Sequence, residues 1–303
     1  MKEMELTTRR KVKTGMGDRM FYLISGLILT VIFLLILYPC IFVVSASFSS
    51  GTAVQSGKVV LWPVDISFVG YDTVFHNVNI WKGFMNSLFY TFFGTIINVA
   101  LTMLAAYPLS RKDLVGRDKL MLFFTFTMFF SGGMIPMYLT VQQLHIYNTT
   151  WAMVLPVAVS AYNLIVCRSF FESGIPVELL EAAKIDGCSD FGFFFKIAIP
   201  LSKTIIAVMC LFYATAMWNQ FFNALMFLQD DGKMPLQVVL RNLVLMNQSN
   251  QMGSSASEMV TKQKLAEQLK YCVVVVSAFP LLCVYPFLQK YFAKGVTIGA
   301  VKG

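Results

Sequence analysis

Amide and aromatic side chains gather near residue 220, and such groups could bind a solute without transforming it. Amides hydrogen-bond to hydroxyl groups, and aromatic faces stack on the C–H faces of sugar rings. The side chains in question are Trp218, Asn219, Gln220 and Asn223, with Tyr162 and Asn163 earlier in the chain. A neutral polar lining of this kind fits an uncharged, polyhydroxylated solute. It is equally typical of amides that simply join one apolar helix to another.

Residues for covalent or metal-assisted catalysis are missing from the sequence. Neither of the two histidines belongs to an H-E-x-x-H motif, and the six cysteines include no C-x-x-C pair. No G-x-S-x-G elbow and no G-x-x-x-x-G-K-[ST] phosphate loop occurs. We therefore expect a chain that is not an enzyme, holds no metal or cofactor and binds no ATP itself. The cysteines should pack as small hydrophobic residues.

The segment 172–203 contains a strongly patterned stretch that begins at Pro176 and runs to Gly187. Proline suits the first turn of a helix, and glycine suits the left-handed residue just past its end. The pattern predicts a short helix over 176–186, about 16 Å long. This helix would project the charges of Glu181 and Asp186.

The segment also contains two alanines within the predicted helix and three phenylalanines after it. Ala182 and Ala183 add no bulk, so another backbone could approach the helix closely. Phe191, Phe194 and Phe195 follow with helical spacing and predict one apolar face. Taken alone, such a face is typical of a connecting helix that lies on a membrane surface.

The composition places these motifs in a membrane protein. Apolar residues make up 57% of the 303 residues and charged residues only 13%, which is roughly half the usual charged share. Five windows carry no charge, and a spanning helix needs about 20 apolar residues. We expect an all-α polytopic fold with six transmembrane helices, near 21–46, 84–108, 119–140, 150–171, 204–227 and 271–292.

The third of these expected helices contains Ser131-Gly132-Gly133. This triplet predicts a break or a flexible segment. The sequence leaves open whether it gates a path or only packs.

The distribution of lysine and arginine predicts that both termini are cytoplasmic. With that orientation the inner segments hold 17 of these residues and the outer segments hold 7, as the positive-inside rule requires. The net charge of +8 then records topology, and no basic stripe points to nucleic acid. The expected divisions are a cytoplasmic tail 1–20, a first helix 21–46, an extracytoplasmic segment 47–83, a core 84–292 that includes the loop 172–203, and a cytoplasmic tail 293–303.

The string Glu181-Ala182-Ala183, Gly187 and Ile197-x-Ile199-Pro200 resembles the EAA loop of ABC-importer permeases. That family pattern is E-A-A-x-x-x-G, nine residues, then I-x-L-P, and Ile199 stands where leucine is usual. The ending G-x-x-x-G-A-x-K-G, residues 295–303, is similar to that of the carbohydrate, maltose-type branch. The resemblance covers the chain from about residue 15 to its end.

The resemblance implies a type I ABC-importer permease fold, as in the inner-membrane components of binding-protein-dependent transport. The chain would form half of a path for oligosaccharides in the bacterial cytoplasmic membrane. Its partners would be a second permease subunit, two ATPase subunits, an extracytoplasmic solute-binding protein and membrane lipid, with no nucleic acid.

The resemblance also assigns roles within the loop, whose helix would dock into a cleft of the ATPase. Glu181 would meet a basic group, Ala182 and Ala183 would permit close approach, and Gly187 would make the turn. Phe194 and Phe195 would fill apolar space in the cleft.

Two alternatives stay open on the sequence. The same fold could import amino acids, peptides or anions, but a charged solute would need lysine or arginine along the path, and the five charge-free windows hold none. A polytopic membrane enzyme would need convergent acidic, basic or metal-binding groups at membrane depth, and these are missing from the spans.

Overall fold

The computed structural model describes residues 15–249, 263–283 and 286, and its regular structure is helical. Within that part no β-strand forms, and only an isolated bridge joins Ser49 to Ile66. The helices are α1 Met16–Ser47, α2 Gly51–Gln55, α3 Val69–Phe75, α4 Val78–Ser110, α5 Arg117–Phe129, α6 Met134–Gln143, α7 Thr150–Val154, α8 Ala161–Gly174, α9 Val177–Ile185, α10 Asp190–Phe193, α11 Ile199–Leu201, α12 Lys203–Trp218, α13 Phe222–Phe227, α14 Leu236–Ser249 and a last helix Gln263–Cys283. Shorter turns are η1 Leu155–Val157, η2 Phe194–Ala198 and η3 Asp231–Lys233. The expected all-α class is confirmed.

Membrane-spanning length is reached in two ways. The helices α1, α4 and Gln263–Cys283 are each long and apolar enough to cross alone. Three further spans result only if bent pairs are counted together: α5 with α6 at 118°, α7–η1 with α8 at 54°, and α10–α11 with α12 at 80°. The described residues thus hold three to six spans, and the expected break at 131–133 separates α5 from α6.

The fifth expected span, 204–227, is not one continuous helix. α12 ends at Trp218, and α13 begins only at Phe222. At the end of α12 the Asn219 side chain donates to the Thr215 carbonyl oxygen at 2.9 Å, where it competes with the backbone for that acceptor. Asn219 and Gln220 therefore lie in a turn, and Asn223 lies in the first turn of α13.

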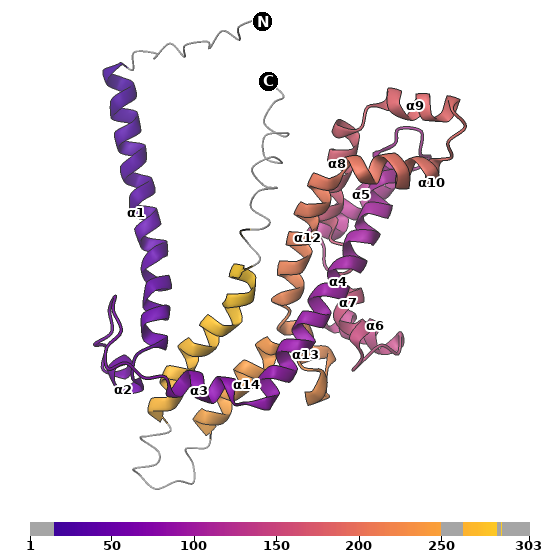
Figure 1. Cartoon of the computed structure of the whole chain (residues 1–303). Helices are drawn as coiled ribbons and strands as arrows, with labels where there is room; N and C mark the ends of the chain where they lie inside the picture. The colour runs from indigo at the N-terminus through magenta and orange to yellow at the C-terminus, as the bar shows by residue number, and fades with distance from the viewer. Residues whose placement is uncertain (1–14, 250–262, 284–285, 287–303) are drawn as a thin grey trace, which may run out of the picture.

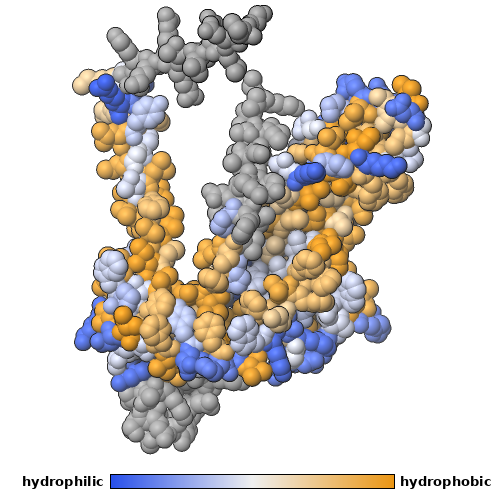
Figure 2. Space-filling view, in the orientation of Figure 1, coloured by the Kyte–Doolittle hydropathy of each residue, from blue (hydrophilic) through white to orange (hydrophobic). Residues whose placement is uncertain are grey.

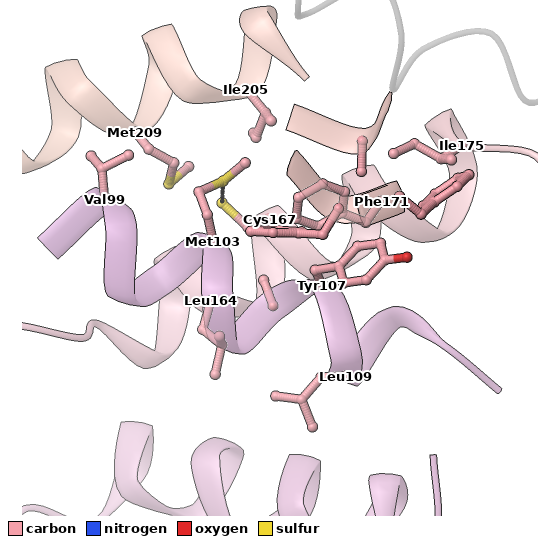
Figure 3. Close-up of a cluster of buried hydrophobic side chains, with 14 of the residues drawn as sticks. Val99, Met103, Tyr107, Leu109, Leu164, Cys167, Phe171, Ile175, Ile205 and Met209 are labelled. Atoms are coloured by element: carbon pink, nitrogen blue, oxygen red, sulfur yellow. Dashed lines mark hydrogen bonds between the residues drawn. The ribbon is translucent and has the colours of Figure 1, made fainter. Parts of the chain in front are cut away.

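α4 is the central helix of the bundle, packed against α8, α12 and α14. Its buried face includes Met103 and Tyr107, which meet Leu164 and Cys167 of α8 (Figure 3). The Cys167 thiol lies 3.9 Å from the Met103 sulfur within this apolar cluster. Cys167 thus packs as the small hydrophobic residue that the sequence predicted.

The two ends of the bundle differ in their elements. α9 and α10 lie at one end with the start of α1, whereas α2, α3 and α14 lie at the other (Figure 1). Hydrophilic residues gather towards both ends, and hydrophobic ones cover the surface between them (Figure 2). This banding is typical of a protein that spans a membrane. The tails 1–14 and 287–303 lie outside the described residues.

α1 stands apart from the other helices (Figure 1). None of its most apolar window is buried, and its only buried residues are Ser45, Ala46 and Ser47 at its end. There the Ser47 hydroxyl lies 2.8 Å from the Tyr71 hydroxyl of α3. Almost all of the apolar surface of α1 is thus left for lipid or another chain.

Candidate functional site

α9 forms where the sequence predicted a short helix, and its ends follow local rules. Pro176 is its N-cap residue, and Glu178 lies in its first turn, near the positive end of the helix dipole. At the other end the Cys188 N–H donates to the Ala183 carbonyl at 2.8 Å and the Gly187 N–H to that of Lys184 at 3.0 Å. Gly187 has φ +78°. This pair of bonds with a left-handed glycine is a Schellman stop.

The two faces of α9 have different environments. Leu180 and Ala183 are buried in the apolar cluster that also holds Tyr107 of α4. Glu181, Ala182 and Asp186 are exposed. The two alanines therefore differ, because Ala182 faces outward whereas Ala183 packs against the chain itself.

The phenylalanines after α9 do not share one face, contrary to the prediction. Phe194 is 5% exposed and its ring centroid lies 5.0 Å from that of Tyr107. Phe191 and Phe195 are 76% and 58% exposed. Adjacent residues on a helix point about 100° apart, so Phe194 turns inward beside the buried Phe193 while Phe195 turns outward with Phe191. Phe194 thus belongs to the core, and the outer apolar surface consists of Phe191 and Phe195.

Ion pairs fasten the start of the loop to the bundle. Glu172 at the end of α8 lies 3.3 Å from Arg168 and 3.6 Å from Arg117 at the start of α5. Arg168 also donates from Nε to the Leu109 carbonyl at the end of α4, at 2.9 Å. These contacts hold α4, α5 and α8 together at the point where the loop begins. α9 is therefore attached to a well-anchored part of the bundle.

A cavity of about 1000 Å³ lies among α4, α8, α12 and the last helix. Three of the predicted path residues line it: Tyr162, Asn163 and Asn219. Asn98 of α4, fully buried, also lines it. The lining is Asn98, Pro156, Val157, Val159, Ser160, Tyr162, Asn163, Leu211, Phe212, Tyr213, Thr215, Ala216, Met217, Asn219, Leu281 and Leu282, with no acidic or basic side chain.

Trp218, Gln220 and Asn223, also predicted for the path, do not line this cavity. Trp218 is buried, and its indole N–H donates to the Ser277 carbonyl of the last helix at 3.0 Å. Gln220 donates to the sulfur of Met217 at 2.9 Å. The indole thus joins α12 to the last helix, whereas the bond of Gln220 stays within its own turn. Asn223 is half-buried in α13.

The structure also brings a cation to the end of α12, which the sequence did not predict. Arg241 of α14 lies over the ring of Phe221, with its guanidinium carbon 5.7 Å from the ring centroid. One turn before it, Val238 packs in the same apolar cluster as Phe221 and Met217. Arg241 lies outside the expected spans, between the fifth and the sixth, so a search of the spans alone could not find it. The amphipathic pattern of 236–249 was the available signal.

Comparison with known proteins supports this architecture. Residues 99–298 match the family model described as "Binding-protein-dependent transport system inner membrane component". A relative from Bacillus subtilis (strain 168), "Polygalacturonan/rhamnogalacturonan transport system permease protein YtcP", is 44% identical, covering 95% of this chain and all of the relative. "Protein LplC" of the same organism is 38% identical over 99% of both chains.

A solved structure has a similar fold. It is titled "Crystal structure of a bacterial ABC transporter involved in the import of the acidic polysaccharide alginate". The matching chain superposes with a TM-score of 0.81 and 34% identity, over 92% of this chain and 99% of that one.

Proposed function

The chain belongs to the family of binding-protein-dependent transport system inner membrane components, and we propose that it couples an ATPase to oligosaccharide uptake through α9. Members of this family are multi-pass permease subunits of ABC importers, not enzymes, and several similar chains are sugar permeases. The permease works with a partner permease, an ATPase and a binding protein. The proposal below concerns which residues of this chain do the coupling and line the path.

The observation that carries the proposal is the two-sided character of α9. Its inner side, through Leu180 and Ala183, is fixed in the bundle core, whereas Glu181 and Ala182 point outward. A short helix closed by a Schellman stop is stiff, so a push on its outer side moves the core residues with it. A flexible loop would absorb such a push.

The roles follow from exposure. Glu181 meets a basic group of the ATPase, and Ala182 allows the two backbones to approach closely. Asp186 adds a second outward charge at the C-cap, where Gly187 makes the turn. Phe191 and Phe195 fill apolar space in the ATPase cleft, in the place that the sequence had given to Phe194.

The translocation path is built from the cavity among α4, α8 and α12. Its amides and hydroxyls supply hydrogen bonds to sugar hydroxyl groups, and its ring at Tyr162 offers a stacking face. The second permease subunit closes the other side of the path. The apolar surface of α1, unburied in this chain, packs against that second subunit, and both termini lie in the cytoplasm.

Reversal of charge at Glu181 tests the coupling role. Glu181→Lys should assemble in the membrane with its partners but lose both sugar uptake and the stimulation of ATP hydrolysis by the loaded binding protein. The matched control is Asp118→Lys, because Asp118 is a 93% exposed acid at the same end of the bundle, in α5. Normal uptake by Glu181→Lys in reconstituted vesicles would refute the docking role.

A panel of solutes tests the transported class. Reconstituted importer with its binding protein should take up oligosaccharides and leave amino acids and peptides outside. Uptake of peptides but no sugar would refute the oligosaccharide proposal and leave the role of α9 untouched.

A further inference from the structure

A second cavity, of about 630 Å³, lies beside α9 and has no part in the path described above. Its walls come from the end of α4, from the link 111–115 and from α9 and α10. The lining residues are Leu104, Tyr107, Pro108, Arg111, Asp113, Leu114, Val115, Leu180, Asp190, Phe191 and Phe194. A ligand here would touch both the bundle and the coupling segment.

Arg111 lines this cavity and forms no ion pair with a carboxylate of the described residues. Its guanidinium lies over the ring of Tyr107, 4.7 Å from the centroid, and 6.0 Å from that of Phe193. Its Nε and one terminal nitrogen are buried and find no acceptor among the described residues. Buried guanidinium N–H groups are seldom left unpaired, because nothing then replaces the water they lost. The unpaired positive charge of Arg111 at the cavity wall therefore favours an anionic group such as a phosphate.

A carboxylate lies close by in sequence and on the same cavity. Asp113 lines it and takes part in no ion pair within the described ranges, whereas Asp190 is already 3.3 Å from Lys184. One cation and one anion are thus available to a ligand. This combination suits a zwitterion better than a simple anion.

The cavity also extends along α4, from the charged residues at the end of this helix into its apolar part. Arg111 is the first charged residue after the window 83–110. Leu104, on the same helix, lies seven residues earlier, which is roughly 10 Å of rise along α4. A phospholipid has its polar head at one level and its apolar chains at the other, which matches this arrangement of the cavity wall.

We propose that this cavity binds a zwitterionic aminophospholipid of the phosphatidylethanolamine class. The phosphate accepts hydrogen bonds from Arg111, and the primary ammonium donates to Asp113. The parts of the acyl chains next to the headgroup lie along Leu104, Pro108 and Leu114. Because Leu180 of α9 and Phe191 of α10 complete the walls, the bound lipid fills the space between the bundle and the coupling segment and steadies α9.

Headgroup selectivity distinguishes this proposal from general lipid adhesion. Phosphatidylcholine carries a cation with no N–H to donate, and phosphatidylglycerol carries no cation at all. The purified importer complex would be stripped of lipid in detergent, incubated with each of the three lipids with identical chains, and examined by native mass spectrometry. We expect retention of phosphatidylethanolamine at concentrations roughly tenfold lower than for the other two.

Variants assign the selectivity to the cavity. Arg111→Gln should weaken the binding of all three lipids, because each carries the phosphate, whereas Asp113→Asn should lower phosphatidylethanolamine binding to the level of phosphatidylglycerol and so abolish the preference. Lys119→Gln, a loss of charge at an exposed residue of α5 outside the cavity, is the matched control and should change nothing. Co-elution of the partner subunits verifies that each variant is assembled.

Four results with the complete importer would overturn the proposal. These are equal retention of the three lipids, a preference for phosphatidylglycerol, unchanged binding in Arg111→Gln, and competition by free phosphoethanolamine at the same concentration as the lipid. The last would mean a water-soluble ligand. If lipid is retained by the permease pair and lost once the ATPase subunits join, the ATPase occupies the cavity instead, which is equally fatal.

Discussion

Phe194 and Phe195 are neighbours in the sequence, and the structure gives them opposite tasks. Phe194 is 5% exposed and packs on Tyr107, whereas Phe195 is 58% exposed on the outer surface. Replacement of each by alanine therefore separates stability from coupling. Phe194→Ala should destabilise the permease, and Phe195→Ala should leave it stable while weakening its response to the ATPase.

The size of each effect follows from burial. Truncation of a fully buried phenylalanine removes the transfer free energy of the ring and leaves a cavity, about 3–5 kcal/mol in all. Phe195 keeps less than half of its surface buried, mostly through edge contact with Phe194 at a centroid distance of 4.9 Å. Its truncation should lower the free energy of unfolding by only about 1 kcal/mol.

Both variants would be purified with their partner subunits and unfolded by heat, with intrinsic fluorescence as the signal. The same preparations, reconstituted in vesicles, would be assayed for ATP hydrolysis with and without loaded binding protein. A large loss of thermal stability in Phe195→Ala, or none in Phe194→Ala, would contradict the assignment of inner and outer faces. Normal stimulation of ATP hydrolysis in Phe195→Ala would contradict only the proposed apolar contact of Phe195 with the ATPase, and not the assignment of the two faces.

Three further substitutions test other features. Gly187→Ala should lower the free energy of unfolding by roughly 1 kcal/mol, because the backbone φ of +78° is strained for alanine. No atom lies within 4 Å of the added methyl group, so a steric clash does not contribute. An unchanged melting temperature would contradict this backbone strain. Trp218→Phe loses its hydrogen bond to Ser277, so the melting temperature should fall slightly while the KM for uptake stays unchanged; a raised KM would return Trp218 to the path. Arg241→Gln should lower the melting temperature slightly, because the contact of the guanidinium with the Phe221 ring is lost, with Lys82→Gln as the control for loss of an exposed positive charge; equal melting temperatures of the two variants would contradict a stabilising contact.

The sequence predicted α9 well because every determinant of that helix is local. Pro176 sets its start, Gly187 sets its stop, and no distant contact is needed for either. The break near residue 132 was predictable for the same reason, since two glycines lie in succession there and Gly133 adopts φ +86°.

The direction of individual side chains was not predictable, because it depends on contacts between distant segments. Phe193 and Phe194 turn towards Tyr107, some 87 residues before Phe194 in the sequence, and the local pattern gives no sign of that contact. The end of α12 likewise removed Trp218 from the path and placed its indole against the last helix. Arg241 became relevant only because α14 folds back onto α4 and Phe221.

These contacts form a continuous mechanical connection between α9 and the path. Phe193 and Phe194 rest on Tyr107 of α4, and the same helix carries Asn98, which lines the larger cavity nine residues earlier. Close-packed side chains transmit displacement instead of absorbing it. α8 leads into α9 and supplies Asn163 to the opposite wall, so both walls of the cavity connect directly to the coupling segment. If α9 couples as proposed, its movement reaches both walls of the proposed path together, which is what a change of access requires.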